Sequence, residues 1–169
     1  MKKLLLLLVP ALLLISCNND DDSSSASVEG TWKLTTFTTS QPSDVNNDGV
    51  ETTNFIAETN CYNNSFLILS SNSVANARIE ELDLTLDLVA GTTDQYEYTV
   101  DCLSAEDAFG VWAQNNNTVT VTIDGEPLDL SLSGNTLSVT IPDFAAIEVE
   151  QNGTIVTEFV GATLVFTKQ

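Results

Sequence analysis

The chain has 169 residues, 24 acidic side chains against 5 basic ones, no histidine and a formal charge of −19. This length predicts one domain with its own hydrophobic core, and an apolar content of 43% argues against a disordered chain. So acidic a surface repels phosphate backbones, and we expect no nucleic-acid partner. Serine triads and most zinc hydrolases need histidine, so we expect no catalytic residues and no enzyme activity.

Residues 1–16 have the layout of a secretion signal. Lys2 and Lys3 form a basic head, and the leucine-rich residues 4–15 are too short to span a bilayer as a helix. The run ends in Leu-Ile-Ser-Cys at Cys17, which resembles the lipobox of bacterial lipoproteins. That resemblance implies lipidation of Cys17 and a membrane as partner. An ordinary cleaved signal followed by a coincidental cysteine is the alternative.

Residues 17–27 form an acidic and serine-rich tether. Asp20, Asp21 and Asp22 follow Cys17 closely, and a serine run leads on to residue 27. The acidic triplet is similar to the export signal of Bacteroidetes lipoproteins, which implies an outer-membrane protein exposed at the cell surface. The alternative is a solvated spacer on a protein that faces the periplasm.

From residue 28 onward, apolar and polar residues alternate, which is typical of half-buried antiparallel strands. Asp124-Gly125, Gly134-Asn135 and Asn152-Gly153 fall between such runs and predict tight hairpin turns. We expect about eight strands, among them residues 30–38, 65–69, 82–88, 96–100, 119–123, 128–132 and 137–141.

A meander of about eight strands favours an all-β, antiparallel up-and-down barrel over residues 28–169, because closure removes exposed strand edges. A β-sandwich is the alternative. Ser104 to Asp107 has a capping serine and acidic residues, which predicts the start of one short helix.

Gly30, Thr31 and Trp32 open the first expected strand, and a strand-like segment at residues 163–169 closes the chain. With the lipoprotein tether and the all-β meander, these features resemble the lipocalin-like lipoproteins of Bacteroidetes. The resemblance covers about residues 28–169 and implies a lipocalin-like barrel whose floor is closed by the Trp32 indole. It also implies a cation stacked on that indole, for which Lys168 is the candidate.

Cys61 and Cys102 remain in the mature chain once Cys17 is lipidated. An even pair of cysteines in an oxidising envelope predicts a disulfide, and free thiols are the alternative. No histidine is present to activate either thiol as a nucleophile.

Residues 44–51 resemble the first half of an EF-hand calcium loop. Asp44, Asn46 and Asp48 supply side-chain oxygens at positions one, three and five, Gly49 stands at six, and Val50 would offer its carbonyl. Position twelve is Phe55 where the pattern needs an acid, so Glu51 or Glu58 would have to bend back. Calcium is the one cofactor that we consider, and a plain solvated turn is the alternative.

These features together predict a surface-anchored, monomeric binding module for a small hydrophobic ligand or a glycan. A carrier requires an open apolar cavity, whereas a glycan binder requires an exposed platform made from Tyr62, Tyr96, Tyr98 or Trp112. A barrel filled by its own side chains would instead indicate a structural or interaction component of a cell-envelope assembly.

Overall fold

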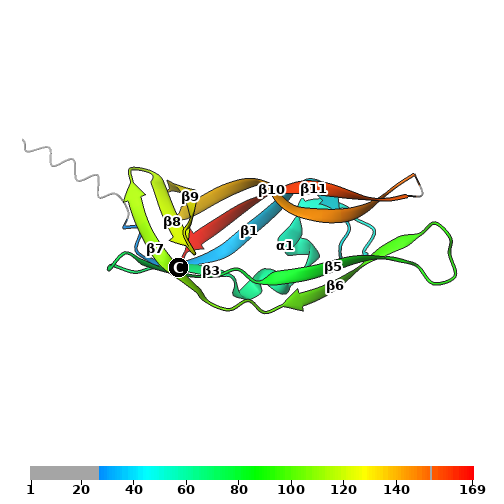
Figure 1. Cartoon of the computed structure of the whole chain (residues 1–169), viewed down its shortest axis with the longest axis horizontal. Coiled ribbons are helices and arrows are strands. Elements are labelled where there is room, and N and C mark those ends of the chain that lie inside the picture. The colour runs from blue at the N-terminus through cyan, green and yellow to red at the C-terminus, as the bar shows by residue number, and fades with distance from the viewer. Residues whose placement is uncertain (1–26, 153) are drawn as a thin grey trace, which may run out of the picture.

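The computed structural model describes residues 27–152 and 154–169. Eight antiparallel strands close into a barrel at one end of an elongated molecule, and two long hairpins extend from its other end (Figure 1). Around the barrel the order is β1 (Gly30–Ser43), β3 (Phe66–Leu69), β4 (Val74–Arg78), β7 (Ala108–Asn115), β8 (Thr118–Ile123), β9 (Glu126–Ser133), β10 (Thr136–Gln151) and β11 (Thr154–Lys168).

Pairing between β11 and β1, with Trp32 opposite Lys168, closes the barrel. The predicted up-and-down barrel is therefore confirmed over the sandwich. Side chains alternate across the pleat: in β8, Val119 and Val121 are 0% and 5% exposed, whereas the flanking threonines Thr118, Thr120 and Thr122 are more exposed. The β8–β9 turn is the predicted tight hairpin, since Asp124 and Gly125 both have positive φ, at 53° and 87°.

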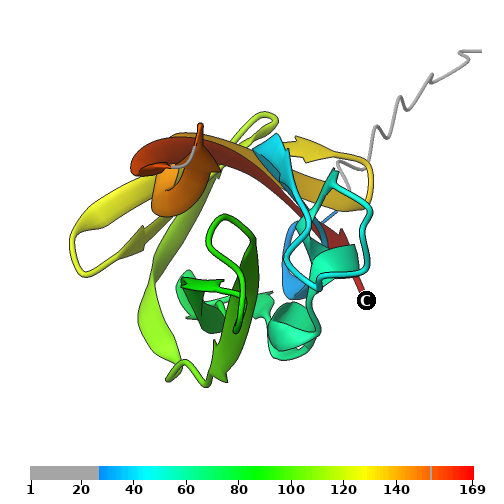
Figure 2. The same cartoon turned by 90° about the vertical axis from the view of Figure 1, so that its right-hand side faces the viewer.

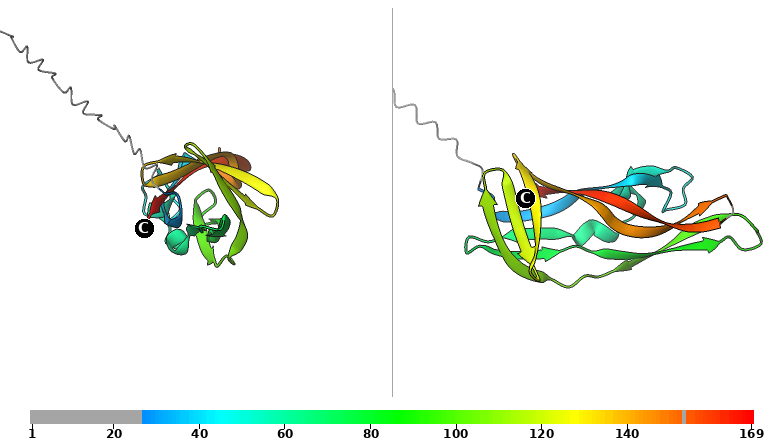
Figure 3. Two further views of the ribbon diagram at one scale, coloured as in Figure 1. Left: turned by 90° about the vertical axis from the view of Figure 1, so that its left-hand side faces the viewer. Right: turned by 45° about the horizontal axis from the view of Figure 1, so that its top comes forward.

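The hairpin lobe, as we name it, comprises residues 40–64, 81–103 and 145–160. Strands β5 (Glu81–Leu88) and β6 (Tyr96–Leu103) form a separate two-stranded sheet in it, and β10 and β11 run on from the barrel into it. Strand β2 (Thr52–Asn54), helix α1 (Phe55–Glu58) and the 3₁₀ turn η1 (Cys61–Asn64) complete the lobe. Figures 2 and 3 show the two hairpins facing each other along the long axis.

The sequence predicted about eight strands but misplaced two of them. Residues 82–88 and 96–100 do form strands, yet they pair only with each other, outside the barrel. Their places around the barrel are taken by β4 and β7. These two strands pair with each other, with Ala75 opposite Gly110 and Ala77 opposite Ala108. Because β7 occupies the edge of β4, the intervening hairpin has no barrel edge to join.

The predicted helix at residues 104–107 is wrong. These residues connect β6 to β7 without helical structure. The Asp107 carboxylate pairs with the Arg78 guanidinium at 2.5 Å and accepts a hydrogen bond from Asn76. Asp107 is thus held by β4, and a helical turn beginning at Ser104 would have to give up this tertiary contact.

An irregularity in the β10–β11 ladder marks the junction between the barrel and the hairpin lobe. Between the pairs Ile141–Ala162 and Ala145–Val160, residues 142–144 of β10 stand opposite Gly161 alone. A Cβ atom on Gly161 would lie 2.6 Å from the Pro142 carbonyl oxygen, so the approach requires glycine. The bulge brings the Phe144 ring to 5.2 Å from the Phe37 ring of β1.

Candidate functional site

The barrel contains an apolar cavity of about 290 Å³. Exposure of its lining rises along β9, from Leu130 at 2% to Leu128 at 41%, so the cavity opens at the β8–β9 turn. Its one charged lining residue is Glu126. The other lining residues are Leu67, Ala77, Ile79, Val121, Ile123, Leu128, Leu130, Val139, Ile141, Phe144, Leu164 and Phe166.

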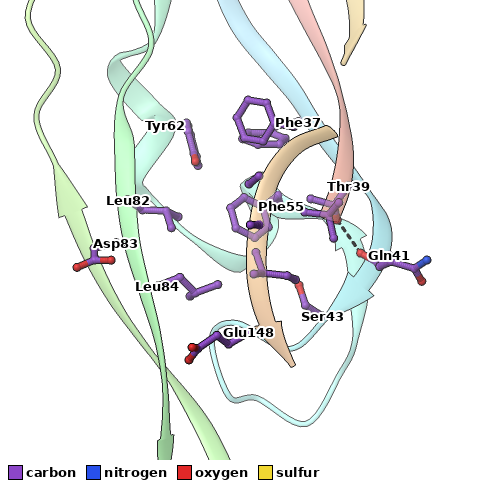
Figure 4. Close-up of a pocket in the computed structure, with 15 residues that line it drawn as sticks. Phe37, Thr39, Gln41, Ser43, Phe55, Tyr62, Leu82, Asp83, Leu84 and Glu148 are labelled. Atoms are coloured by element: carbon purple, nitrogen blue, oxygen red, sulfur yellow. Dashed lines mark hydrogen bonds between the residues drawn. The ribbon is translucent and has the colours of Figure 1, made fainter. Parts of the chain in front are cut away.

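A second hollow, the central groove, lies where the hairpin lobe meets the barrel and measures about 260 Å³ (Figure 4). Its inner wall is an aromatic cluster in which the Phe37 ring lies 5.1 Å from Phe55 and 4.8 Å from Tyr62. Leu82 and Leu84 project from β5 toward these rings, while Asp83 points to the other side of the strand. The period-two alternation of β5 therefore supplies the groove with apolar side chains.

A third hollow, the distal hollow, lies further out between the hairpins and measures about 500 Å³. Tyr96, Tyr98 and Leu86 line it from the inward faces of β6 and β5. Five carboxylates also line it, from three separate parts of the chain: Asp44, Glu51, Asp94, Glu150 and Glu158.

The three hollows adjoin one another because they share lining residues. Phe144 lines both the barrel cavity and the central groove, and Ile147 lines both the central groove and the distal hollow. Gln41 and Ser43 of β1 are also common to the groove and the distal hollow. The arrangement is a row of recesses that is apolar in the barrel and acidic at the far end.

Tyr98 and Asn47 connect β6 to the other segments that line this row of hollows. The Tyr98 hydroxyl donates to the Glu148 carbonyl at 3.1 Å, which joins β6 to β10. The Asn47 side chain both donates to the Tyr98 carbonyl and accepts from the Tyr98 amide, at 2.8 and 3.1 Å. Asn47 thus bonds the edge of β6 as a neighbouring strand would.

Burial and charge raise the pKa of two tyrosines along the row. Desolvation, with a smaller contribution from the Glu81 carboxylate, raises the pKa of Tyr62 to about 12. Desolvation and the negative charge of Glu51 raise the pKa of Tyr98 above its ordinary value. Both phenols stay neutral at physiological pH, and the distal hollow carries a negative potential.

Trp32, predicted to close the barrel floor, is 1% exposed, and its indole N–H donates to the Val28 carbonyl at 2.9 Å. The Lys168 ammonium lies 5.5 Å from the Trp32 ring centroid and donates to the Ser27 carbonyl. Gly30 has φ of 133°, and a Cβ there would lie 3.1 Å from the Lys168 Cε atom. Glycine therefore lets the lysine stem lie across the floor.

The predicted disulfide is present: Cys61 of η1 is bonded to Cys102 of β6. The bond joins the β5–β6 hairpin to the segment that follows α1. Cys61 is buried, and the Thr59 hydroxyl donates to its sulfur at 2.8 Å.

The loop for which we considered calcium is a turn that satisfies its own polar groups. The Asp44 carboxylate accepts the amides of Asp48 and Gly49, and Asp48 in turn accepts the amide of Val50. Glu58, 6% exposed, reaches this loop and accepts the amides of Val45 and Asn46.

A cation would have to replace these hydrogen bonds. Within residues 27–152 and 154–169, no three acidic or cysteine side chains are gathered as metal ligands would be. Calcium binding by Asp44, Asn46, Asp48, Val50 and Glu51 stays a prediction.

The aromatic residues considered for a glycan platform do not share one exposed face. Tyr62 is 6% exposed inside the aromatic cluster, and the half-buried Trp112 of β7 donates its indole N–H to the Ser70 carbonyl at 2.9 Å. Tyr96 and Tyr98 are half-buried and face the distal hollow.

Cys17 and the acidic triplet Asp20–Asp22 lie outside the described residues. Among the residues that are described, no helix has the length and apolar character needed to cross a bilayer. Comparison with protein-family models, with curated proteins and with solved structures gives no match.

The sequence analysis missed the residues that connect the hollows. Phe144 stands in a run, Pro-Asp-Phe-Ala-Ala, without clean alternation, because the bulge opposite Gly161 breaks the period of β10. A proline within a strand pattern is the one signal that pointed to this irregularity. Phe37 and Phe55 carry no sequence signal for contact, since their rings meet only through the tertiary fold.

Proposed function

We propose that this protein is a lipid-anchored binding module of the lipocalin-like kind, displayed on the outer membrane, which takes a small apolar ligand into its barrel. The observation that carries the proposal is the barrel cavity, whose lining is apolar except for Glu126 and which adjoins the central groove at Phe144, a residue that lines both.

Size and chemistry both support an apolar occupant. Small-molecule sites are concave, mostly apolar recesses of roughly 300–1,000 Å³ with few polar groups. The barrel cavity and the central groove measure about 290 and 260 Å³, and they adjoin at Phe144. An apolar ligand in them gains about 25 cal/mol for each Å² of its surface removed from water.

The same observations favour an apolar ligand over a glycan. Glycan binding would use exposed aromatic faces with polar groups beside them, yet Tyr62 is packed against Phe37 and Phe55. Tyr96 and Tyr98 lie in the acidic distal hollow and on a different element from Trp112.

Binding of the neutral fluorophore N-phenyl-1-naphthylamine tests the proposal. Ala77 lines the cavity, so an Ala77→Leu change fills space and should weaken binding about tenfold or more. Ala113→Leu is the matched control, because Ala113 lies exposed on the outside of β7. If the wild-type protein does not bind, or if both variants bind as it does, the barrel is a structural or interaction domain.

The anchor is tested separately, with labelled fatty acid in cells. Replacing Cys17 by alanine should abolish acyl labelling, and undiminished labelling would refute lipidation there. Neutralising Asp20–Asp22 should remove the protein from the cell surface. Unchanged accessibility to protease on intact cells would instead favour the spacer interpretation and a periplasm-facing protein.

A further inference from the structure

We propose, building on the apolar-ligand function above, that the ligand is a cationic amphiphile. Its apolar part occupies the barrel cavity and the central groove, and its positively charged head group lies in the distal hollow. The juxtaposition that carries this inference is a row of adjoining recesses that changes from apolar walls to carboxylate walls along its length.

The charges of the hairpin lobe are of one sign. The five basic residues of the chain are Lys2, Lys3, Lys33, Arg78 and Lys168, none of which falls in the lobe. Arg78 is paired with Asp107, and Lys168 lies on the barrel floor. A recess lined by carboxylates from three parts of the chain focuses a negative potential, which concentrates cations and repels anions.

Aromatic side chains accompany these carboxylates. Tyr96 and Tyr98 are half-buried in the lining of the distal hollow, and tyrosine faces attract ammonium groups. Glu51, Asp94 and Tyr98 line the same hollow, so the ring and the carboxylates can act on one head group. This combination suits an amine or a quaternary ammonium group.

The blind end of the barrel favours a small amphiphile over a peptide segment. Trp32 and Lys168 close the floor, so the cavity admits the end of an apolar chain. Beyond Phe144, Leu82 and Leu84 continue the apolar wall as far as Ile147, where the distal hollow begins. A ligand with one apolar end and one cationic end matches this sequence of recesses, which runs from the apolar barrel cavity to the acidic distal hollow.

Three probes with the same ten-carbon chain test the head group: decyltrimethylammonium, 1-decanol and decanoate, each below its micelle concentration. Each competes with N-phenyl-1-naphthylamine for the protein. We expect the cation to bind about tenfold more tightly than the alcohol and the anion to bind most weakly, with the difference shrinking as salt is added. If cation and alcohol bind equally, this inference is overturned and the proposed function stands. If N-phenyl-1-naphthylamine binds but no ten-carbon probe displaces it, this inference is also overturned and the proposed function stands; if the fluorophore itself does not bind, both are overturned.

Two double variants locate the effect. Glu51→Gln with Asp94→Asn removes two charges from the distal hollow and should weaken decyltrimethylammonium about fivefold while leaving 1-decanol unchanged. Glu29→Gln with Asp129→Asn removes two charges from exposed positions that line none of the three hollows and should change neither ligand. Equal losses of cation affinity in both double variants would show a general effect of net charge and would overturn the assigned head-group site.

Discussion

The barrel and the hairpin lobe are built from the same alternating strands, yet they bury their apolar faces to different degrees. In the barrel every strand has two neighbours, and inward residues such as Leu137 and Val119 are fully buried. In the lobe β5 has one neighbour, and its inward residues Leu82, Leu84 and Leu86 remain half-exposed. Closure therefore decides how much an apolar face contributes to the core.

The incomplete burial in the lobe leaves apolar surface for a ligand. A closed sheet buries its whole inward face, whereas the two facing hairpins of the lobe are joined by only a few contacts, such as the hydrogen bond from the Tyr98 hydroxyl to the Glu148 carbonyl. We infer that the barrel supplies most of the stability and that the lobe supplies the walls of the groove and the distal hollow.

The largest expected difference between the two regions concerns leucine truncation. Leu137→Ala in the barrel should cost about 4 kcal/mol of the free energy of unfolding, because the residue is 0% exposed. Leu84→Ala in the lobe should cost about 1 kcal/mol, because the side chain is half-exposed. Urea unfolding measures both, and equal costs would contradict the proposed division of stability.

Removing the disulfide should be next in size. The Cys61–Cys102 bond closes a loop with a sequence separation of 41 residues, for which chain entropy predicts about 4 kcal/mol at most. Cys61→Ser with Cys102→Ser should lower the free energy of unfolding by roughly 2–4 kcal/mol and speed hydrogen exchange in β6 more than in β8. Thiol reduction of the unchanged protein is the control. An unchanged unfolding midpoint would show that the bond does not stabilise the fold.

Alkaline pH should destabilise the protein through Tyr62. Its folded pKa of about 12 lies above the ordinary value of 10.0, so the unfolded chain loses the phenol proton first as pH rises. The stabilisation is present below pH 10 and is lost as pH rises to about 12. Thermal unfolding between pH 9 and 12 measures the effect, and Tyr62→Phe should flatten its high-pH part. A Tyr62→Phe protein with the same pH profile would contradict the assignment.

The smallest expected effect is that of calcium on the 44–51 loop. A loop without the bidentate acid should bind at about millimolar affinity and raise the melting temperature slightly. Calcium, magnesium and sodium are compared at equal ionic strength, with Asp44→Ala/Asp48→Ala protein as the control. If all three cations act alike, or if the double variant responds as well, the loop is only an acidic turn.

The sequence predicted those features that depend on local pattern. Alternation located most of the strands and Asp124-Gly125 located a hairpin turn; the Trp32 indole, which the Gly30-Thr31-Trp32 element singled out, is buried and has Lys168 beside it. These predictions were possible because side-chain period and turn conformation are set by neighbouring residues.

Features set by distant pairing escaped prediction. Strand β4 was missed because its inward residues, Ala75 and Ala77, are too small to give an apolar signal. The 82–88 run has the clearest alternation in the chain, yet it lies outside the barrel. Alternation shows that a strand has one buried face, but it does not show which strand will pair with it. The row of hollows depends on such pairing and on the bulge at Gly161.

Residues Ser27 and Val28 meet the rest of the domain at the Trp32 floor, which is the end of the molecule opposite the hairpin tips (Figure 1). Under the proposed lipid anchor at Cys17, the domain would be attached through its closed end, and the hairpin tips would be the part of the domain farthest from that attachment. The distal hollow, which lies between the hairpins, would then be the recess farthest from the membrane. If the proposed anchor is correct, the position of the floor decides which end of the domain faces away from the membrane.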